Sequence, residues 1–368
     1  MQRSRELDGI RGIAVLMVLV WHYVVCQILG APAGSGLASL RDSLWLTWSG
    51  VDLFFVLSGF LIAGILLDHR GASNYFRAFY IRRACRILPL YYLLIGIHIL
   101  LRILPFQAQQ TEWLLREPMP LWSYAVFVQN IFMGMSGDFG APSLGITWSL
   151  AVEEQFYLLI PLLIHLVRPK WAGAIMLTAV AAAPVLRICW PGFHSFVNMP
   201  WRADSLLSGA CLAVLVRKPG FLEWVRRNPR WILGMLGLFA GVAVWMTIRP
   251  AWAGELRYLW LAGLYSTCVL VGFALTESRV AAVFRSPILV WFGVRSYGIY
   301  LFHQTISGLL HGLVRGAPPD IRTPEGLAVT SGALIATIII AATSYRFLEL
   351  PIIRFGHRSE YHPSHVKS

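Results

Sequence analysis

Eleven apolar runs, most of them long enough to cross a bilayer, constrain this 368-residue chain more than any other feature. About 20 apolar residues in a helix span a hydrocarbon core of about 30 Å. Charged residues make up 13% of the chain, about half the share in soluble proteins. The sequence therefore predicts an all-α polytopic membrane protein in contact with lipid. The runs are 10–29, 48–67, 87–105, 121–135, 147–167, 171–190, 203–216, 231–248, 257–276, 288–311 and 327–348.

The distribution of charge predicts how many runs cross. The chain carries 31 Lys and Arg against 18 Asp and Glu, and the basic residues cluster in short loops between runs. This follows the positive-inside rule and disfavours a nucleic-acid partner. If all eleven runs crossed, the basic loop 217–230 would face outward. The run 121–135 is short and holds Gln129 and Asn130, so we expect a re-entrant or interfacial segment there and about ten crossings.

With ten crossings, both termini lie in the cytoplasm and the protein is a multi-pass protein of the bacterial cytoplasmic (inner) membrane. Residues 1–350 form the transmembrane domain and 351–368 a short basic cytoplasmic tail. The long outer connection, 106–146, is rich in proline. The five cysteines are scattered and form no CxxC pair, so no metal site is predicted. We expect Gly234, Gly237 and Gly241 to mark close helix packing.

Ionisable residues inside the runs are the strongest functional signal, because each costs on the order of 3 kcal/mol to insert. Counting 1.5 Å per residue from the span ends, His22, Asp52, Glu153 and His303 all fall in the outer half of the membrane. Arg11 and His22 are eleven residues apart, about three helical turns, and so share one face. This pattern indicates a passage through the helices that polar side chains line. A histidine that only bonds a neighbouring backbone is the alternative for His22.

The segment 148–157 places Ser149 and Glu153 one turn apart on one face, so Glu153 is a better candidate than Glu154 to face the passage. A helix-capping glutamate near the interface is the alternative. Trp148 begins this segment and is a candidate substrate contact.

Two groups of charges flank the spans. Arg82, Arg83 and Arg86 precede the third span; they either signal topology and contact lipid head groups or grip a phosphate in a bidentate manner. Arg202 and Asp204 stand at the start of the seventh apolar run, either as a mutual ion pair or as groups that hold an acceptor.

Several stretches together resemble the membrane acyltransferase-3 family. They include Arg5-Glu-Leu-Asp-Gly-Ile-Arg-Gly12 with His22, residues 50–62, Arg82 to Pro89, Trp148 to Tyr157, Arg202-Ala-Asp204, Ser296 to His303 and Phe347 to Pro351. The family pattern of an arginine followed, after ten residues, by a histidine falls on Arg11 and His22. The family's arginine pair falls on Arg83 and Arg86. The resemblance implies about ten crossings and acylation of hydroxyl groups from acyl-CoA.

The mechanism that this resemblance implies uses acyl-CoA as a donor substrate and no permanently bound cofactor. Arg11, Arg82, Arg83 and Arg86 would bind the donor. His22, oriented by Glu153 or Asp52, would act as general base near neutral pH, and an acyl-enzyme through Ser149 or His22 stays open. Trp148, Arg202, Asp204 and His303 would contact an extracytoplasmic or lipid-linked carbohydrate.

A different class of function is also open. A transporter or flippase for a polar or lipid-linked solute needs buried polar residues in many spans as well. Neither repeated halves nor paired broken spans are evident in the sequence, which disfavours it. The oligomeric state and the acceptor are not predicted.

Overall fold

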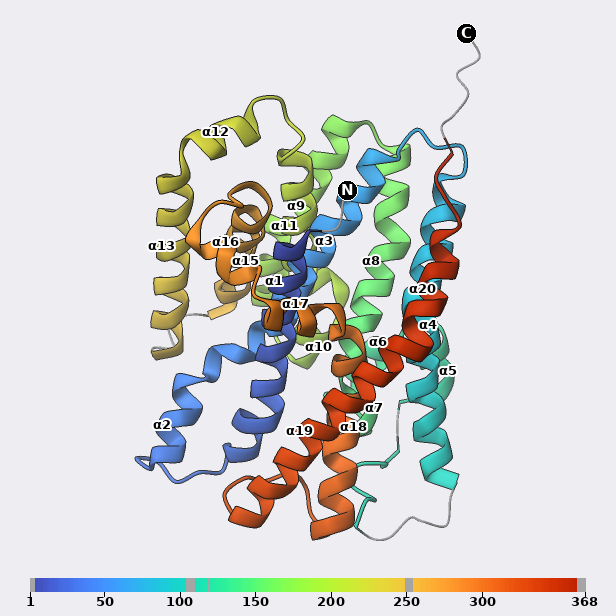
Figure 1. Ribbon diagram of the computed structural model, residues 1–368, viewed down its shortest axis with the longest axis vertical. Coiled ribbons are helices and arrows are strands. Elements are labelled where there is room, and N and C mark those ends of the chain that lie inside the picture. Colours follow the sequence, from blue (N-terminus) through green and yellow to red (C-terminus); the bar gives the residue numbers. More distant parts are fainter. Residues whose placement is uncertain (1–3, 104–109, 118, 249–253, 363–368) are drawn as a thin grey trace.

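The computed structural model describes residues 4–103, 110–117, 119–248 and 254–362, and this part of the chain is helical without a β-strand (Figure 1). The all-α prediction is confirmed. The elements are α1 (Arg5–Val20), η1 (Trp21–Val25), η2 (Cys26–Ile28), α2 (Gly36–Ser43), η3 (Trp45–Ser49), α3 (Gly50–Asp68), α4 (Tyr75–Ile103), α5 (Leu121–Ala125), α6 (Gln129–Ser136), α7 (Pro142–Gly145), α8 (Thr147–Leu166), α9 (Pro169–Cys189), α10 (Phe193–Val197), η4 (Met199–Arg202), α11 (Ala203–Leu215), α12 (Phe221–Arg227), α13 (Pro229–Ile248), η5 (Gly254–Leu256), α15 (Arg257–Ala274), α16 (Arg279–Phe284), α17 (Pro287–Val294), α18 (Ser296–Arg315), α19 (Pro324–Ser344), η6 (Tyr345–Glu349) and α20 (Leu350–His357).

Eight helical segments among the described residues are long and apolar enough to cross a membrane. They cover Arg5–Ile28, Gly36–Asp68, Tyr75–Ile103, Pro142–Leu166, Pro169–Cys189, Pro229–Ile248, Gly254–Ala274 and Pro324–His357. The two other expected crossings are helical but differ from a simple span. Helix α11 has 13 residues, about 20 Å at 1.5 Å per residue. The run 288–311 is two helices, α17 and α18, with Arg295 at the break.

The run 121–135 forms two short helices, α5 and α6, with Phe127 between them in a left-handed backbone conformation. Neither helix is long enough for a crossing, as expected from Gln129 and Asn130. Both of those amides are fully buried and bonded to protein, Gln129 to Thr147 O and Asn130 to Val197 O. Part of the outer connection, residues 104–109 and 118, and part of the tail, residues 363–368, lie outside the described residues.

Helix α1 lies inside the bundle and packs against α3, α15, α16, α17 and α18 (Figure 1). Close backbone contact is made by glycines, for example where α3 crosses α11. A Cβ at Gly59 would lie 1.9 Å from Leu206 O, and one at Gly209 would lie 1.9 Å from Val56 O. The expectation for Gly234, Gly237 and Gly241 is wrong, because a Cβ there would meet no atom within 4 Å. Helix α13 presents this side away from its neighbours.

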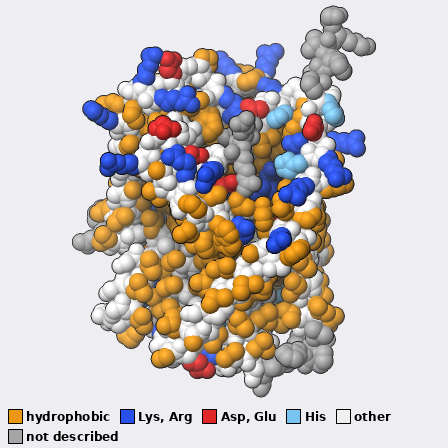
Figure 2. All heavy atoms as spheres, viewed as in Figure 1, with side chains coloured by type: hydrophobic (Ala, Val, Ile, Leu, Met, Phe, Trp, Pro, Cys, Tyr) orange, Lys and Arg blue, Asp and Glu red, His pale blue; other side chains and the backbone are white. Residues whose placement is uncertain are grey.

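The two ends of the bundle differ in charge (Figures 1 and 2). Lys and Arg gather over the end that holds α12 and the last turns of α20, whereas the opposite end is mainly apolar on the face shown. The α18–α19 connection lies at that opposite end. There, Arg322 bonds Asp320 at 2.6 Å, and its hydrogen bonds hold the pKa of Asp320 down at about 2. The charges of this connection are thus neutralised within the loop.

Candidate functional site

Two cavities lie on either side of one tyrosine. The arginine cavity, of about 110 Å³, is lined by Arg11, Ser58, Arg83, Arg86, Ser149, Glu153 and Tyr157 among others. The aromatic cavity, of about 570 Å³, is lined by Trp21, His22, Trp45, Trp48, Arg116, Trp148, Phe196, Arg257, Tyr258 and Gln304 among others. Among the described residues, only Val51 and Tyr300 line both. These two side chains therefore stand between the two cavities, at a point that we call the neck.

The arginine cavity is built by α1, α3, α4, α8 and α18. Helix α1 brings Arg11, whose Nη1 lies 3.2 Å from Asp8, and α4 brings Arg83 and Arg86. Neither Arg83 nor Arg86 forms an ion pair with a described residue. Two guanidinium groups three residues apart on one helix, neither held in an ion pair by a described carboxylate, can bind an anion such as a phosphate.

Arg82 is directed elsewhere. Its Nε donates to Ser359 O at 2.9 Å, and its guanidinium lies 5.0 Å from the ring centroid of Tyr361. It is not among the residues that line the arginine cavity. Arg82 therefore ties the C-terminal segment to α4, while the expected partners Arg11, Arg83 and Arg86 share the cavity.

Glu153 and Ser149 line the arginine cavity together, as their one-turn spacing predicts. Ser149 Oγ and Tyr300 OH are 2.6 Å apart, and Tyr300 OH also donates to Ile146 O at 3.1 Å. The tyrosine at the neck is therefore fixed to the start of α8. Glu153 lies on the arginine side of this neck and has no hydrogen bond to His22 among the described contacts.

His22 lies in η1, a π-helical turn that continues α1 and lines the aromatic cavity. π-Helical turns within α-helices are rare and frequently occur at functional sites. The Nδ1 atom of His22 is 3.0 Å from Val18 O and 3.2 Å from His303 Nε2. The sequence places both histidines at one depth, and the structure brings their rings into contact.

The backbone fixes the proton positions of this pair. His303 Nδ1 is 2.6 Å from Tyr300 O, which can only accept, so His303 Nδ1 carries a proton and its Nε2 has a lone pair. His22 Nδ1 faces that lone pair and Val18 O, so it must be the donor. In the neutral ring, His22 Nε2 is then the unprotonated nitrogen, and it bonds no described residue.

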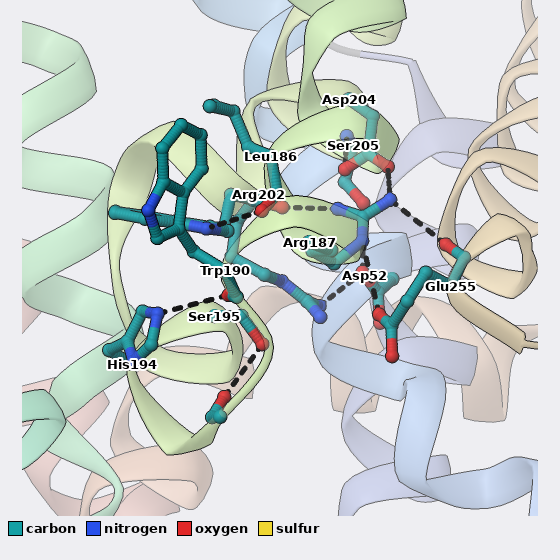
Figure 3. Close-up of polar contacts among 12 residues, drawn as sticks. Asp52, Leu186, Arg187, Trp190, His194, Ser195, Arg202, Asp204, Ser205 and Glu255 are labelled. Atoms are coloured by element: carbon teal, nitrogen blue, oxygen red, sulfur yellow. Dashed lines mark hydrogen bonds and ion pairs between the residues drawn. The ribbon is translucent and has the colours of Figure 1, made fainter.

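Asp52, Arg202 and Asp204 lie together in one cluster of polar contacts (Figure 3). Arg202 pairs with Asp52, Ser205 Oγ donates to Asp52 at 2.8 Å, and Arg187 donates to Asp204 at 2.6 Å. All of these ionic side chains are at most 1% exposed. The structure thus pairs Asp52 with Arg202 in place of His22, and Asp204 with Arg187 in place of Arg202.

This buried network holds the wall of the cavity. The guanidinium of Arg202 lies 4.3 Å from the ring centroid of Tyr258, 5.4 Å from Phe196 and 5.9 Å from Trp148. These three rings line the aromatic cavity. Cation–π contacts of this kind favour one arrangement of the rings. Arg202 therefore supports the cavity from behind, and Trp148 faces it.

Several site residues were not singled out by sequence reasoning. Tyr300 lies in the stretch Ser296 to His303 that carries the family resemblance but was not picked out there, and Arg257 is the first residue of an apolar run and was passed over. Arg187 lies near the end of a span, where a basic residue is ordinary. Among the described residues, no group of three or more His, Cys, Asp or Glu is arranged to hold a metal ion.

A family model and several known proteins match nearly the whole chain. The acyltransferase-3 family model, described as "Acyltransferase domain", matches residues 4–346. The peptidoglycan O-acetyltransferase OatA of Listeria monocytogenes is 30% identical over 95% of this chain and 56% of its own length. The O-acetyltransferase OatA of Staphylococcus aureus is 27% identical over 96% of this chain and 58% of its own length. The chain thus spans less than two thirds of these relatives, and no solved structure matches it significantly.

Proposed function

Because this chain belongs to the acyltransferase-3 family, we propose that it is a membrane O-acetyltransferase. It moves an acetyl group from cytoplasmic acetyl-CoA to a hydroxyl of an extracytoplasmic or lipid-linked carbohydrate. The O-acetyltransferase names of the relatives support the reaction type, and one relative's name points to peptidoglycan as an acceptor. The observation that carries the proposal is the pair of cavities that meet at Tyr300.

The basic end of the bundle is assigned to the cytoplasm, which follows the positive-inside rule and the concentration of Lys and Arg there (Figure 2). The proposal accordingly takes the bacterial inner membrane as the location, with both termini inside. The arginine cavity then opens toward the donor side. Arg83 and Arg86 bind phosphates of acetyl-CoA, Arg11 adds a third positive charge, and Glu153 offsets part of it.

The distance between the two sites suits a pantetheine arm. Arg11 and His22 lie eleven residues apart along one helix, about 16 Å at 1.5 Å per residue. A thin arm that enters past Arg11 brings its thioester to the neck at Tyr300. The acceptor enters the aromatic cavity from the other side, so the bilayer separates the two substrates until they meet.

His22 acts as the general base in the proposed step. Its Nε2 takes the proton of the acceptor hydroxyl as that oxygen attacks the thioester carbonyl carbon. The tetrahedral intermediate collapses with cleavage of the C–S bond, and the imidazolium returns its proton to the departing thiolate of coenzyme A. The products are the acetyl ester and free coenzyme A, with no net proton change. His303 is a positioning residue that keeps the proton of His22 on Nδ1.

Direct transfer is favoured over an acyl-enzyme through Ser149. Ser149 Oγ lies 2.6 Å from Tyr300 OH and 3.1 Å from Ile146 O, and its single proton serves one of the two. Its described hydrogen-bond partners are thus a phenol and a carbonyl, and neither is a base suited to activate a hydroxyl. Ser149 instead holds Tyr300 at the neck.

The proposal is tested with the full chain in proteoliposomes, labelled acetyl-CoA and a peptidoglycan fragment as acceptor. The His22→Ala variant should lose acetyl transfer by about 10²-fold or more, the scale of a lost general base, while it still binds coenzyme A. Full transfer by His22→Ala would remove His22 from the mechanism. Movement of the fragment across the bilayer without consumption of acetyl-CoA would favour the transporter alternative.

A further inference from the structure

We infer that the aromatic cavity is an acceptor site for an acidic sugar: its rings stack on a pyranose, and Arg257 pairs with a carboxylate on that sugar. This inference rests on the proposed function, because it gives the acceptor's chemical class and the residues that recognise it. It assigns a binding role to Arg257 and to Trp21, Trp45 and Trp48.

The shape and chemistry of the wall favour a sugar ring. Three aromatic pairs surround the cavity: Trp21–Trp45, Trp48–Tyr258 and Trp148–Phe196, with ring centroids 5.3, 5.5 and 4.8 Å apart. The cavity volume of about 570 Å³ lies in the range of ligand sites. Flat apolar faces match the C–H face of a pyranose, and the hydroxyl groups at its rim need hydrogen-bond partners.

The indole N–H groups supply such partners. An indole is a donor only, and elsewhere in the chain Trp260 donates to Phe239 O at 2.9 Å. The four tryptophans of the aromatic cavity donate to no described residue. A hydrocarbon occupant offers no acceptor to an indole N–H that faces it, at a cost in binding. An occupant with hydroxyl oxygens satisfies them, so a carbohydrate fits this wall better than a lipid chain.

Arg257 adds selectivity for a negative charge. Three guanidinium groups surround the ring of Tyr258: those of Arg187, Arg202 and Arg257 lie 4.6, 4.3 and 5.0 Å from its centroid. Arg187 and Arg202 are held by acidic side chains, as Figure 3 shows for Asp204 and Asp52. Arg257 forms no ion pair with a described residue, and its Nε is buried without a partner.

The other charges around the cavity are already satisfied. Glu255, two residues from Arg257, contacts Arg187 at 3.5 Å. Arg116 bonds Asp138 at 2.5 Å and Gly140 O at 2.7 Å. Arg257 is thus the arginine of this cavity that has no carboxylate partner among the described residues and can pair with an anionic ligand. A guanidinium presents paired N–H groups that match a carboxylate.

A single carboxylate fits better than a phosphate on the grounds of charge. The arginine cavity gathers Arg11, Arg83 and Arg86 for the multiply charged phosphates of the donor. The aromatic cavity offers the single unpaired charge of Arg257. This difference also keeps the donor's nucleotide out of the acceptor site. His22 lines the same cavity, so a sugar anchored at Arg257 can present a hydroxyl to Nε2.

The test measures binding directly, so that it does not depend on catalysis. The full chain in lipid nanodiscs is titrated calorimetrically with the methyl glycoside of N-acetylmuramic acid and with the methyl ester of that glycoside, which has the same ring but no charge. The free acid should bind about tenfold more tightly than the ester, as expected for one charge-assisted pair. Arg257→Gln should bring this ratio close to one and leave the ester's affinity unchanged.

Matched variants separate the two parts of the site. Arg257→Lys should keep part of the preference for the acid, whereas Trp48→Leu should weaken acid and ester alike. Arg227→Gln, at an exposed arginine of α12, should leave both affinities and the ratio as in the wild type. Retained coenzyme A binding shows that each variant is folded. If Arg257→Gln does not fold, the wild-type ratio and Arg257→Lys decide.

Equal affinity for acid and ester in the wild-type protein, or an unchanged ratio in Arg257→Gln, would overturn the inference. Acetyl transfer is measured on the same samples. Transfer that proceeds without a preference for the acid leaves the proposed function standing and removes the role of Arg257. A preference for the acid without any transfer from acetyl-CoA supports the site and contradicts the proposed function.

Discussion

The arginine cavity and the aromatic cavity differ in size and in the side chains that line them. One is lined by three arginines and a glutamate, among others, in about 110 Å³; the other is lined by four tryptophans, two tyrosines, two arginines and His22, among others, in about 570 Å³. Charge recognition dominates the first and ring stacking the second. Only Val51 and Tyr300 line both among the described residues. This difference indicates how two chemically distinct ligands can bind in separate cavities whose walls share one tyrosine.

The largest effect is expected from the support behind the aromatic cavity. Arg202→Ala leaves Asp52 buried without its partner, and breaking a buried pair costs about 3–5 kcal/mol. We expect a lower Tm in nanodiscs and loss of acceptor binding, because three ring contacts of the wall disappear. Calorimetry with coenzyme A should show the donor site intact in the folded fraction. Equal loss of donor and acceptor binding would contradict the claim that the two cavities bind their ligands separately.

The arginine cavity is tested by the double variant Arg83→Gln, Arg86→Gln. The KM for acetyl-CoA should rise by about 100-fold, because two charge-assisted contacts to phosphate are lost, while the KM for the acceptor stays within about twofold. Steady-state kinetics with each substrate varied in turn measures both values. A rise confined to the acceptor's KM would contradict the assignment of donor and acceptor.

A smaller effect is expected for His303→Asn, because this variant lacks the Nε2 lone pair that orients His22 and its shorter side chain holds the amide oxygen farther from His22 Nδ1. We expect kcat to fall by about tenfold and the pH midpoint of kcat to move, with both KM values nearly unchanged. His303→Gln, whose amide oxygen can accept the His22 Nδ1 proton, should recover part of the rate. A uniform loss of active protein with an unchanged pH profile would assign His303 a structural role only.

The smallest effect is expected for Arg82→Gln. Arg82 contacts Ser359 and Tyr361, outside the arginine cavity, so the KM for acetyl-CoA should rise by less than about threefold. The neighbouring single variant Arg83→Gln is the matched comparison and should exceed that several-fold. Equal effects of the two variants would place Arg82 in the donor site beside Arg83.

The sequence predicted the helices and the polar residues within them, but not the contacts between helices. Hydropathy and loop charge act along the membrane normal, so they predict where a helix crosses and which of its ends is basic. Contacts between helices depend on rotation and lateral packing, which these signals do not encode. The contact of His22 with His303 and the pairing of Asp52 with Arg202 therefore emerged only from the folded chain.

The aromatic cavity was even harder to predict from the sequence. Its rings come from η1, η3, α8, α10, α15 and α18, among others. Of its tryptophans, the sequence analysis singled out Trp148 alone, and the other three are ordinary residues for a membrane protein. The break at Arg295 was also missed, since the apolar run 288–311 continues through it. That break begins α18, the helix that brings Tyr300 and His303 to the site.

The sidedness of the two substrates tests the central claim most directly. Protein of one orientation, checked by protease access to a C-terminal tag, is sealed in liposomes with labelled acetyl-CoA on one side and the acceptor on the other. Acetyl transfer should occur when acetyl-CoA faces the basic end that carries α12 and the acceptor faces the opposite end. Transfer only when acetyl-CoA faces the α18–α19 connection, or only when both substrates share one side, would contradict the account.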